Sequence, residues 1–280
     1  MAPQSRVALV TGGSSGIGEH TVRELLDAGF VVYAVARRVD LMEPLAERGA
    51  HVFAMDVTDD ASMVAGIERI IAERGRIDVL VNNAGYGSYG AVEDVPIDEA
   101  RRQFEVNVFG LARLVQLVAP YMREQRSGRI INISSIGGKF YEPFGAWYHA
   151  TKFAVEGFSD CLRLELKPFG VKVVIIEPGP IIIEWNEIAR DSLLERSGST
   201  AYARWAKRAH RVLTEFDKPG RASTPDVVAR KIRKAATIQR PAARYPVGQG
   251  ARAITLGRDL TPDPIFDQVV GRMFGSNKPA

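Results

Sequence analysis

One short stretch of the chain, residues 11–18, constrains the fold more than any other part of the sequence. It reads Thr-Gly-Gly-Ser-Ser-Gly-Ile-Gly and follows an apolar run, residues 7–10, that predicts a buried strand. After it, Val22 and Leu25 recur at helical spacing until Gly29 ends the pattern. We therefore expect a strand that turns directly into a helix through a glycine-rich connection.

The glycines of this turn have distinct mechanical uses. Gly12 allows a sharp turn, Gly16 lets the backbone approach a phosphate, and Gly18 lets the helix pack closely on the sheet. The N–H groups at the helix start can then bind an anion. The alternative is a tight turn that holds no ligand. The residues expected to bind a dinucleotide here are Gly12, Ser14, Ser15, Gly16, Ile17 and Gly18.

Length and composition set broad limits on the class of protein. The chain has 280 residues, which suits one large α/β domain spanning residues 1–280. Its apolar fraction of 46% and charged fraction of 25% are typical of a soluble globular protein. The net charge of +4 is mild and its basic residues are scattered, so nucleic-acid binding is not indicated.

Cysteine content and the lengths of apolar runs exclude further classes. The single cysteine, Cys161, rules out an internal disulfide and a cysteine-rich metal site, and its helical context predicts a buried side chain. We expect no metal site. No apolar run approaches the ~18 residues of a membrane span, and Met1–Arg6 is too short and polar for a signal peptide. The sequence thus predicts a cytoplasmic protein without a membrane span.

Strand-like and helix-like stretches alternate between residues 6 and 180, which is typical of parallel strands joined by crossover helices. The strands are rich in β-branched residues and apolar on both faces, as buried parallel strands must be. The sequence predicts strands over 6–10, 31–36, 51–55, 78–82, 129–133 and 172–176, with a seventh over 243–247.

Two arginines, Arg37 and Arg38, follow the second predicted strand. A protein that binds NAD usually places an acid there for the adenosine ribose, whereas guanidinium groups suit a ribose 2′-phosphate. Asp40 lies too far along the chain to replace the acid. The sequence thus predicts that NADP(H) is preferred over NAD(H), and the alternative is a solvated arginine pair at a strand end.

Polar residues also follow the third and fourth predicted strands. Asp56, before Val57, could accept from an adenine amino group or take part in a turn, and Thr58 is expected to cap the next helix. Asn82 and its neighbour could tie adjacent strands together or line a cofactor site, because an amide both donates and accepts. The expected cofactor contacts in this region are Asp56, Val57, Asn83, Ala84 and Gly85.

The residues able to carry chemistry lie farther along the chain. A predicted helix over 98–123 places Asn107 within its apolar stripe, so this amide must find buried partners. The fifth strand ends in two serines, and Tyr148 and Lys152 then fall one helical turn apart. An ammonium beside a phenol lowers the phenol pKa from ~10, which would make Tyr148 a usable proton donor or acceptor. Taken alone, a tyrosine and a lysine at this spacing are more often a surface pair.

These residues together resemble the short-chain dehydrogenase/reductase family, in its single-domain branch. Ser135 is preferred to Ser134 because it lies at that family's usual interval before the tyrosine. The resemblance implies a Rossmann-type, doubly wound, seven-stranded parallel sheet with helices on both faces. It is carried by the glycine turn, Asn-Asn-Ala-Gly at 82–85, Asn107, Ser135, the Tyr-x-x-x-Lys pair and Pro178-Gly179.

The resemblance also implies roles for a catalytic tetrad. In such enzymes Tyr148 transfers the proton, Ser135 hydrogen-bonds the substrate oxygen, Lys152 holds the nicotinamide ribose, and Asn107 anchors a water. Tyr148, Lys152, Pro178, Gly179 and Ile181 would also contact the cofactor. The chain departs from the family pattern in having Ile183 where many members have a threonine that binds the nicotinamide, and His149 is assigned no role.

In this family the region over 184–222 covers the substrate. Two helical pieces separated near residues 197–199, together with aromatic residues at 140–147, favour an apolar substrate such as a steroid, retinoid or bulky ketone. The extension over 250–280 resembles the hydroxysteroid and retinol dehydrogenase subgroup. The expected apolar anchors of the covering segment are Trp185, Ile188, Leu193, Leu194, Tyr202, Trp205 and Leu213.

The function expected from the sequence is an NADP-dependent oxidoreductase that interconverts an alcohol and a ketone or aldehyde, working as a homodimer or homotetramer on a small apolar substrate. One alternative is a non-catalytic sensor or partner-binding protein on the same fold, which would be expected to have lost Tyr148 or Lys152. Another is a sugar-nucleotide epimerase or dehydratase, which usually needs a longer chain with a separate substrate domain.

Overall fold

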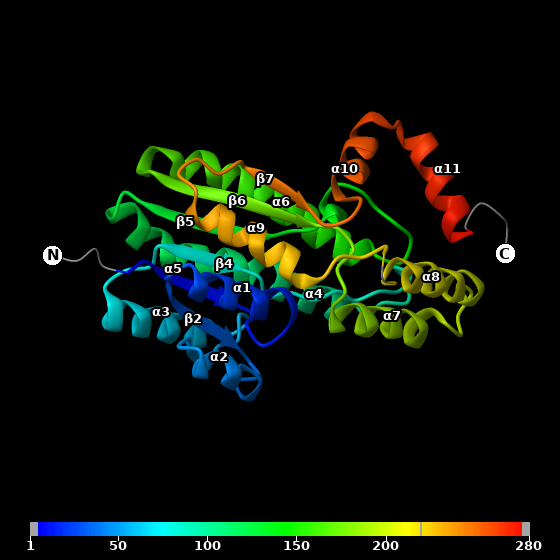
Figure 1. Cartoon of the computed structure of the whole chain (residues 1–280). Helices are drawn as coiled ribbons and strands as arrows, with labels where there is room; N and C mark the ends of the chain where they lie inside the picture. Colours follow the sequence, from blue (N-terminus) through cyan, green and yellow to red (C-terminus); the bar gives the residue numbers. More distant parts are fainter. Residues whose placement is uncertain (1–4, 219, 276–280) are drawn as a thin grey trace.

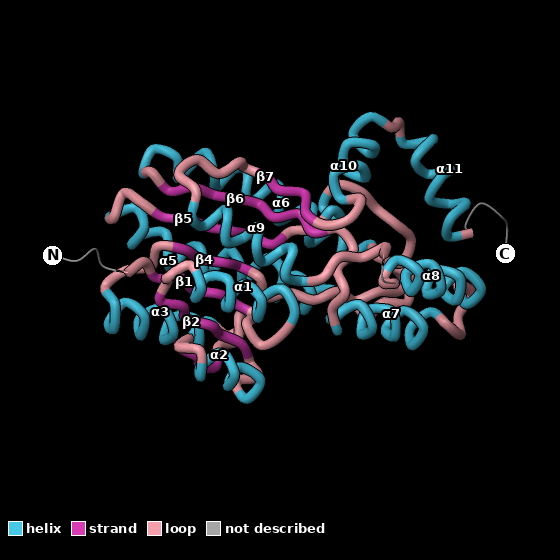
Figure 2. The backbone as a smooth tube through the Cα atoms, viewed as in Figure 1, coloured by secondary structure: helices cyan, strands magenta, loops and turns pink. Residues whose placement is uncertain are grey.

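The fold is a seven-stranded parallel sheet with the strand order β3-β2-β1-β4-β5-β6-β7, covered by helices on both faces (Figures 1 and 2). The computed structural model describes residues 5–218 and 220–275. Hydrogen-bonded neighbours run parallel throughout, so all seven strands end at the same edge of the sheet. The strands are β1 (Val7–Thr11), β2 (Val31–Ala36), β3 (His51–Ala54), β4 (Val79–Asn82), β5 (Gly128–Ile133), β6 (Val171–Pro178) and β7 (Arg244–Val247).

The helices fall into three groups according to what they cover. α1 (Gly16–Asp27), α2 (Glu43–Glu47) and α9 (Pro225–Thr237) cover one face of the sheet. The opposite face packs against α3 (Asp60–Arg74), α5 (Gly110–Glu124) and α6 (Ala146–Leu166). The remaining helices are α4 (Ile97–Phe104), α7 (Glu184–Ser197), α8 (Ala203–Phe216), α10 (Ala251–Leu260) and α11 (Asp263–Phe274), with short turns η1 (Asp40–Met42), η2 (Glu105–Phe109), η3 (Ile136–Gly138) and η4 (Lys167–Phe169).

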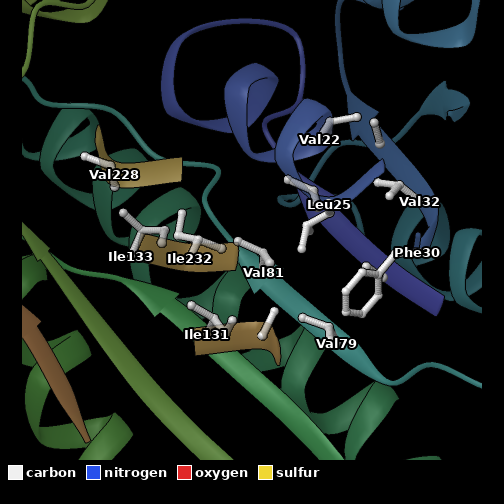
Figure 3. Close-up of a cluster of buried hydrophobic side chains, with 14 of the residues drawn as sticks. Val22, Leu25, Phe30, Val32, Val79, Val81, Ile131, Ile133, Val228 and Ile232 are labelled. Atoms are coloured by element: carbon white, nitrogen blue, oxygen red, sulfur yellow. The ribbon is translucent and has the colours of Figure 1, made fainter. Parts of the chain in front are cut away.

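Strand side chains alternate between two buried apolar cores, which we call the α1/α9 core and the α3/α5/α6 core. In β1, Val10 belongs to the former and Leu9 to the latter, as the two-residue period of a strand requires. Figure 3 shows part of the α1/α9 core, where Leu25 of α1 and Ile232 of α9 meet side chains of the central strands. Burial on both faces explains why these strands are apolar throughout.

The predicted strands all form, with ends that differ from the predicted ends by at most two residues. The expectation that every strand is buried on both faces is wrong for β3 and β7. Three of the four β3 residues are partly buried and Ala54 is exposed, while only Val247 of β7 is fully buried. Both are edge strands, so each has a neighbour on one side alone.

The expected helix over 98–123 also forms, as α4, η2 and α5 in succession. η2 is a single π-helical turn, a feature that is often found at functional sites. Thr58 does not cap α3; Asp59 does, and its carboxylate accepts from the Ala61 N–H at 3.0 Å. The capping residue therefore lies one position later than predicted.

The C-terminal helices gather beyond the carboxyl ends of the strands (Figure 1). α7 and α8 are the two helical pieces expected within 184–222; α11 lies beside α8, and α10 lies beside β7. We use the name C-terminal cluster for the apolar contact of α7, α8 and α11 with residues before them in the chain. Its buried members are Tyr89, Ala189, Leu193, Ala206, Ala209, Val270 and Phe274, with Phe144, Tyr148, Val212, Leu213 and Phe266 packed against them.

Two expectations about individual side chains are wrong. Ile188 is 59% exposed and does not anchor the covering segment, because it lies on the solvent side of α7. Cys161 is exposed, because it lies on the face of α6 that points away from the sheet, between the exposed residues Gly157 and Leu164. The side chain of Trp185, residues 1–4 and residues 276–280 lie outside what the structure describes. Within the described ranges, no helix is long and apolar enough to cross a bilayer.

A buried polar network ties β4, β5 and α6 together. Asn82 Nδ2 donates to Asn132 Oδ1 at 2.9 Å, and Asn132 Nδ2 donates to Ser159 Oγ at 2.9 Å. Asn132 is fully buried, so each hydrogen bond replaces a contact with water that folding removes.

Replacing Asn132 with alanine leaves the buried Asn82 amide without its hydrogen-bond partner, while Ser159 keeps its hydrogen bond to the Val155 carbonyl. We expect the free energy of unfolding to fall by about 2–4 kcal/mol, measured by urea denaturation. The control Gln116→Ala, at an exposed site on α5, should change it by no more than about 0.5 kcal/mol. A loss at Asn132 no larger than that of the control would show that the network adds no net stability.

Candidate active site

The glycine turn between β1 and α1 has the backbone geometry that the sequence predicts. Gly12 and Gly16 have φ values of +67° and +55°, which side chains rarely allow. A Cβ at Gly18 would lie 2.0 Å from the Gly12 carbonyl oxygen, so only glycine permits this approach. Ser15, the residue before α1, makes no side-chain cap, so the first N–H groups of α1 keep their capacity for a ligand. The turn therefore fits the phosphates of a dinucleotide.

Asn83 holds this turn against the end of β4. Its Nδ2 donates to the carbonyl oxygens of Thr11 at 3.0 Å and Gly12 at 3.2 Å. In return, Thr11 Oγ1 accepts from the N–H groups of Asn83 at 3.1 Å and Ala84 at 3.0 Å. The amide thus has the strand-tying role proposed for it, and Thr11 is a partner that the sequence analysis did not identify.

Arg37 and Asp56 lie close together at the carboxyl ends of β2 and β3. Burial raises the pKa of Asp56, but hydrogen bonds from Thr58 and the charges of Arg37 and Arg102 outweigh it and hold this pKa below its usual value. Asp56 Oδ1 accepts from the Thr58 N–H at 2.9 Å, which is the turn role considered as the alternative. Arg37 is exposed and free to meet an anionic group from solvent.

Asn107 is fully paired, as its burial requires. It lies on the π-helical turn η2, where its Oδ1 accepts from the Tyr86 N–H at 2.9 Å. Its Nδ2 donates to the Tyr86 carbonyl at 2.8 Å and to Thr151 Oγ1 at 3.1 Å. A Cβ at Gly85 would lie 3.1 Å from Asn107 Oδ1, so this glycine allows the amide to reach the Asn-Asn-Ala-Gly loop.

Ser135 and Tyr148 are hydrogen-bonded to each other, which supports the choice of Ser135 over Ser134. Burial raises the pKa of Tyr148 to about 12; the Ser135 hydrogen bond opposes this shift and the charge of Glu142 adds to it. Ser135 Oγ also accepts from the Gly137 N–H at 3.0 Å, which fixes the serine at the end of β5. Tyr148 is therefore a neutral proton donor at physiological pH.

Lys152 does not lower the Tyr148 pKa in this structure, so that expectation is wrong. Its Nζ donates to the Ile133 carbonyl oxygen at 3.0 Å and lies 5.8 Å from the centroid of the Tyr148 ring. Burial lowers the pKa of Lys152 to about 8, although the charge of Glu156 acts in the opposite direction. The ammonium is directed at β5 rather than at the phenol oxygen.

The segment after β6 lies against the glycine turn. The Gly179 N–H donates to the Val247 carbonyl at 2.8 Å, and Ile181 forms a parallel bridge with Ser223. Ile183 packs against the α1/α9 core, and its Cγ2 would lie 3.2 Å from a Cβ at Gly16. The isoleucine thus forms an apolar wall over the glycine turn. Because isoleucine offers no hydrogen bond where many family members have a threonine, we expect the nicotinamide to be held less firmly.

Three residues near Tyr148 were missed as site residues. Tyr89 lies with its ring centroid 6.0 Å from that of Tyr148, and its hydroxyl donates to Glu142 Oε1 at 3.2 Å. His149, to which no role was assigned, is buried and contacts the Gly137 carbonyl through Nδ1 at 2.8 Å. The only sequence signal for Glu142 was an acid within a loop of glycines and aromatics.

The aromatic residues expected beside the substrate divide between two places. Phe144 packs against the C-terminal cluster, and Phe140 contacts the His149 ring at a centroid distance of 5.5 Å. Trp147 instead lines a hollow of about 200 Å³ that it shares with residues of α4 and η2. The apolar surface near Tyr148 is therefore built mainly by Tyr89, Phe144 and the C-terminal helices.

Residues 6–192 match the family described as short chain dehydrogenase. The chain belongs to this family. A solved short-chain dehydrogenase from Streptomyces avermitilis is 32% identical, with a TM-score of 0.80 over 99% of this chain and 98% of its own. The chain is accordingly an oxidoreductase acting on CH–OH groups.

Two curated proteins that are named as reductases are also similar to the chain. The 3-ketodihydrosphingosine reductase of Bacteroides thetaiotaomicron is 44% identical over 177 residues, which cover 63% of this chain and 64% of the relative. The NADPH-dependent 3-dehydrocapnine reductase of Ornithobacterium rhinotracheale is 34% identical over 275 residues, covering 94% and 95%. These similarities establish the family but not the hydroxysteroid and retinol subgroup.

The close approach at Gly18 generates a test of the dinucleotide turn. Gly18→Ala forces a Cβ onto the Gly12 carbonyl, so we expect the free energy of unfolding to fall by about 1–3 kcal/mol and NADPH binding to weaken strongly. In the control Gly157→Ala the Cβ meets no atom within 4 Å, and alanine should stabilise α6 by up to about 1 kcal/mol. Thermal melts with and without NADPH measure both effects. Equal behaviour of the two variants would contradict the role of the turn.

Proposed function

We propose that the chain is an NADPH-dependent reductase that interconverts a ketone and a secondary alcohol on an apolar substrate. The observation that carries this proposal is the grouping of Ser135, Tyr148, Lys152 and Asn107 at the carboxyl edge of the sheet, beside the C-terminal cluster. Ligands of open α/β sheets bind at this edge.

The side chains divide the chemistry among them. The cofactor, when bound, supplies the hydride that the carbonyl carbon takes up. Ser135 donates a hydrogen bond to the substrate oxygen, and the Tyr148 hydroxyl, neutral because its pKa lies near 12, gives that oxygen its proton. Lys152, with a pKa of about 8, holds the nicotinamide ribose and passes a proton toward Tyr148. Asn107 anchors a water in this relay.

The cofactor contacts proposed from the sequence agree with the geometry of the cradle. The first turn of α1 faces the phosphates, Asn83, Ala84 and Gly85 line the adjoining wall, and Arg37 binds the ribose 2′-phosphate. The Asp56 carboxylate accepts hydrogen bonds from Thr58, and its negative charge attracts the Arg37 guanidinium. The preference for NADP(H) is supported by Arg37 and Arg38 and by the name of the NADPH-dependent relative.

The substrate proposal rests on the apolar side chains that surround Tyr148. The C-terminal cluster offers aromatic and aliphatic surface from α7, α8 and α11 and from Tyr89 and Phe144. Two relatives are named as reductases of 3-ketodihydrosphingosine and 3-dehydrocapnine. We therefore propose a flexible, long-chain ketone in place of the steroid or retinoid expected from the C-terminal extension.

We also propose that residues 1–280 act as one unit, with 184–222 covering the substrate, and that the protein is a homodimer or homotetramer in the cytoplasm. Support for self-association comes from exposed apolar side chains on η2 and α6: Phe109 is 55% exposed, Phe153 46% and Leu164 64%. Exposed apolar groups that recur on neighbouring helices often mark an interface. A non-catalytic sensor is less well supported, because Tyr148 and Lys152 are both present.

Tyr148→Phe tests the assignment of the proton donor. The variant keeps the ring and its packing against Tyr89, so NADPH affinity should persist while turnover falls by ~10²-fold or more. Absorbance of NADPH during ketone reduction gives the rate, and the matched change Tyr121→Phe on α5 should leave it unaltered. Turnover near wild type in the Tyr148 variant would mean that another group moves the proton.

Arg37→Asp tests the cofactor choice. It removes a charge-assisted contact with the 2′-phosphate and adds repulsion, so NADPH affinity should weaken by about 2–4 kcal/mol while NADH is affected less. Arg240→Asp, an exposed change before β7, controls for net charge. The values to compare are kcat/KM for NADPH and NADH. A wild type that prefers NADH would overturn the argument from Arg37.

A further inference from the structure

The loop between η3 and α6 places one carboxylate, Glu142, beside the proposed proton donor. Its side chain is 11% exposed, and Oε1 accepts from the Tyr89 hydroxyl at 3.2 Å. The Tyr89 ring lies 6.0 Å from that of Tyr148, and the charge of Glu142 raises the pKa of Tyr148. The mechanism proposed above leaves this carboxylate without a role.

No cation of the chain compensates Glu142 among the described residues. Burial raises its pKa to about 7, and the only group that opposes this shift is the neutral Tyr89 hydroxyl. In such surroundings, the ionised form of an acid is strongly stabilised by a positive charge that a ligand brings. The same carboxylate in solvent would be stabilised little by such a charge.

A second buried glutamate near the site provides an internal comparison. Glu156 lies one turn after Lys152 on α6 and is paired with two cations of the chain: Lys139 Nζ at 3.2 Å and Arg244 Nε at 3.0 Å. The fold thus supplies partners for a buried acid where the acid is structural. Among the described residues, Glu142 has no lysine or arginine partner, and only the His149 ring, whose pKa is lowered by burial, lies within ion-pair distance at 4.0 Å, although Glu142 is similarly enclosed.

His149 adds a second acceptor beside Glu142. Its Nδ1 donates to the Gly137 carbonyl at 2.8 Å, which leaves Nε2 of the neutral ring as an acceptor. This Nε2 has no hydrogen-bond partner and lies 4.0 Å from Glu142 Oε1, while the His149 side chain is 6% exposed. Burial lowers the pKa of His149, although the carbonyls of Gly137 and Phe140 act in the opposite direction. The ionised carboxylate and the unpaired Nε2 atom therefore lie 4.0 Å apart with no hydrogen bond joining them, and Tyr89 is the donor that the carboxylate already has.

We propose that Glu142 and the Nε2 atom of His149 bind an ammonium group carried by the substrate next to its carbonyl. An ammonium has three N–H donors and can satisfy both acceptors at once. The carbonyl would then lie beside Ser135 and Tyr148, with the alkyl chain against the C-terminal cluster. The substrate class is an amino ketone with a long alkyl chain. This inference rests on the proposed ketone reductase function.

A matched pair of ketones tests the inference. Aminomethyl octyl ketone carries the ammonium, and ethyl octyl ketone replaces it with a methyl group of similar size. With NADPH, the wild type should show a kcat/KM at least tenfold higher for the amino ketone, as a buried charge-assisted hydrogen bond implies. In Glu142→Gln the preference should fall to threefold or less, and Glu142→Asp, which keeps the charge, should restore part of it.

The control Glu165→Gln, at an exposed position on α6, should keep the wild-type preference. Equal kcat/KM for the two ketones in the wild type would overturn the inference while leaving the reductase function standing, and this comparison needs no variant to fold. An equal loss on both ketones in Glu142→Gln would also overturn it, because the carboxylate would then act on Tyr148 or on folding. Turnover of neither ketone, with NADPH or NADH, would overturn the proposed function and this inference with it.

Discussion

The contact between Asn83 and the glycine turn is the interaction on which the rest of the site depends. The side-chain amide of Asn83 donates to the carbonyl oxygens of Thr11 and Gly12. The Thr11 hydroxyl accepts from the N–H groups of Asn83 and Ala84, in the loop that follows β4. Because β1 and β4 are neighbours in the sheet, this reciprocal tie sets the place of α1 and of the Asn-Asn-Ala-Gly loop together. The loop in turn reaches Asn107, so the dinucleotide cradle and the proposed catalytic groups form one rigid arrangement.

Burial governs the charges of the site more than pairing does. It raises the pKa of Tyr148 to about 12 and lowers that of Lys152 to about 8, so two pKa values that are similar in water move apart in opposite directions. The charges of Glu142 and Glu156 act on these two residues separately, one from the loop and one from α6. In the proposed mechanism, proton transfer depends on the exclusion of water from Tyr148, against which the C-terminal cluster packs.

Much of the fold and of the site could be read from local patterns. Buried parallel strands are apolar throughout, and helical spacing places Tyr148 and Lys152 one turn apart, so both signals lie in the sequence itself. The predictions were wrong where the burial of a side chain depends on which face of a helix packs against the rest of the fold. Cys161 and Ile188 lie on helices whose outward faces are set by packing, and the cap of α3 shifted to Asp59 by one residue. The catalytic roles and the cofactor preference stay predictions.

By itself, the sequence determined the order along the chain of the candidate binding and catalytic residues. A glycine turn follows β1, polar residues follow β2 to β5, and a tyrosine and a lysine lie on the next helix. Each follows from a period or a spacing along the chain, which local geometry converts into a face or an edge. Only the tertiary structure decided that Glu142 and Tyr89, 53 residues apart, meet beside Tyr148, and that no cation of the described chain joins them. Such contacts depend on how a loop without periodicity closes over the sheet, because no local rule fixes the direction of its side chains.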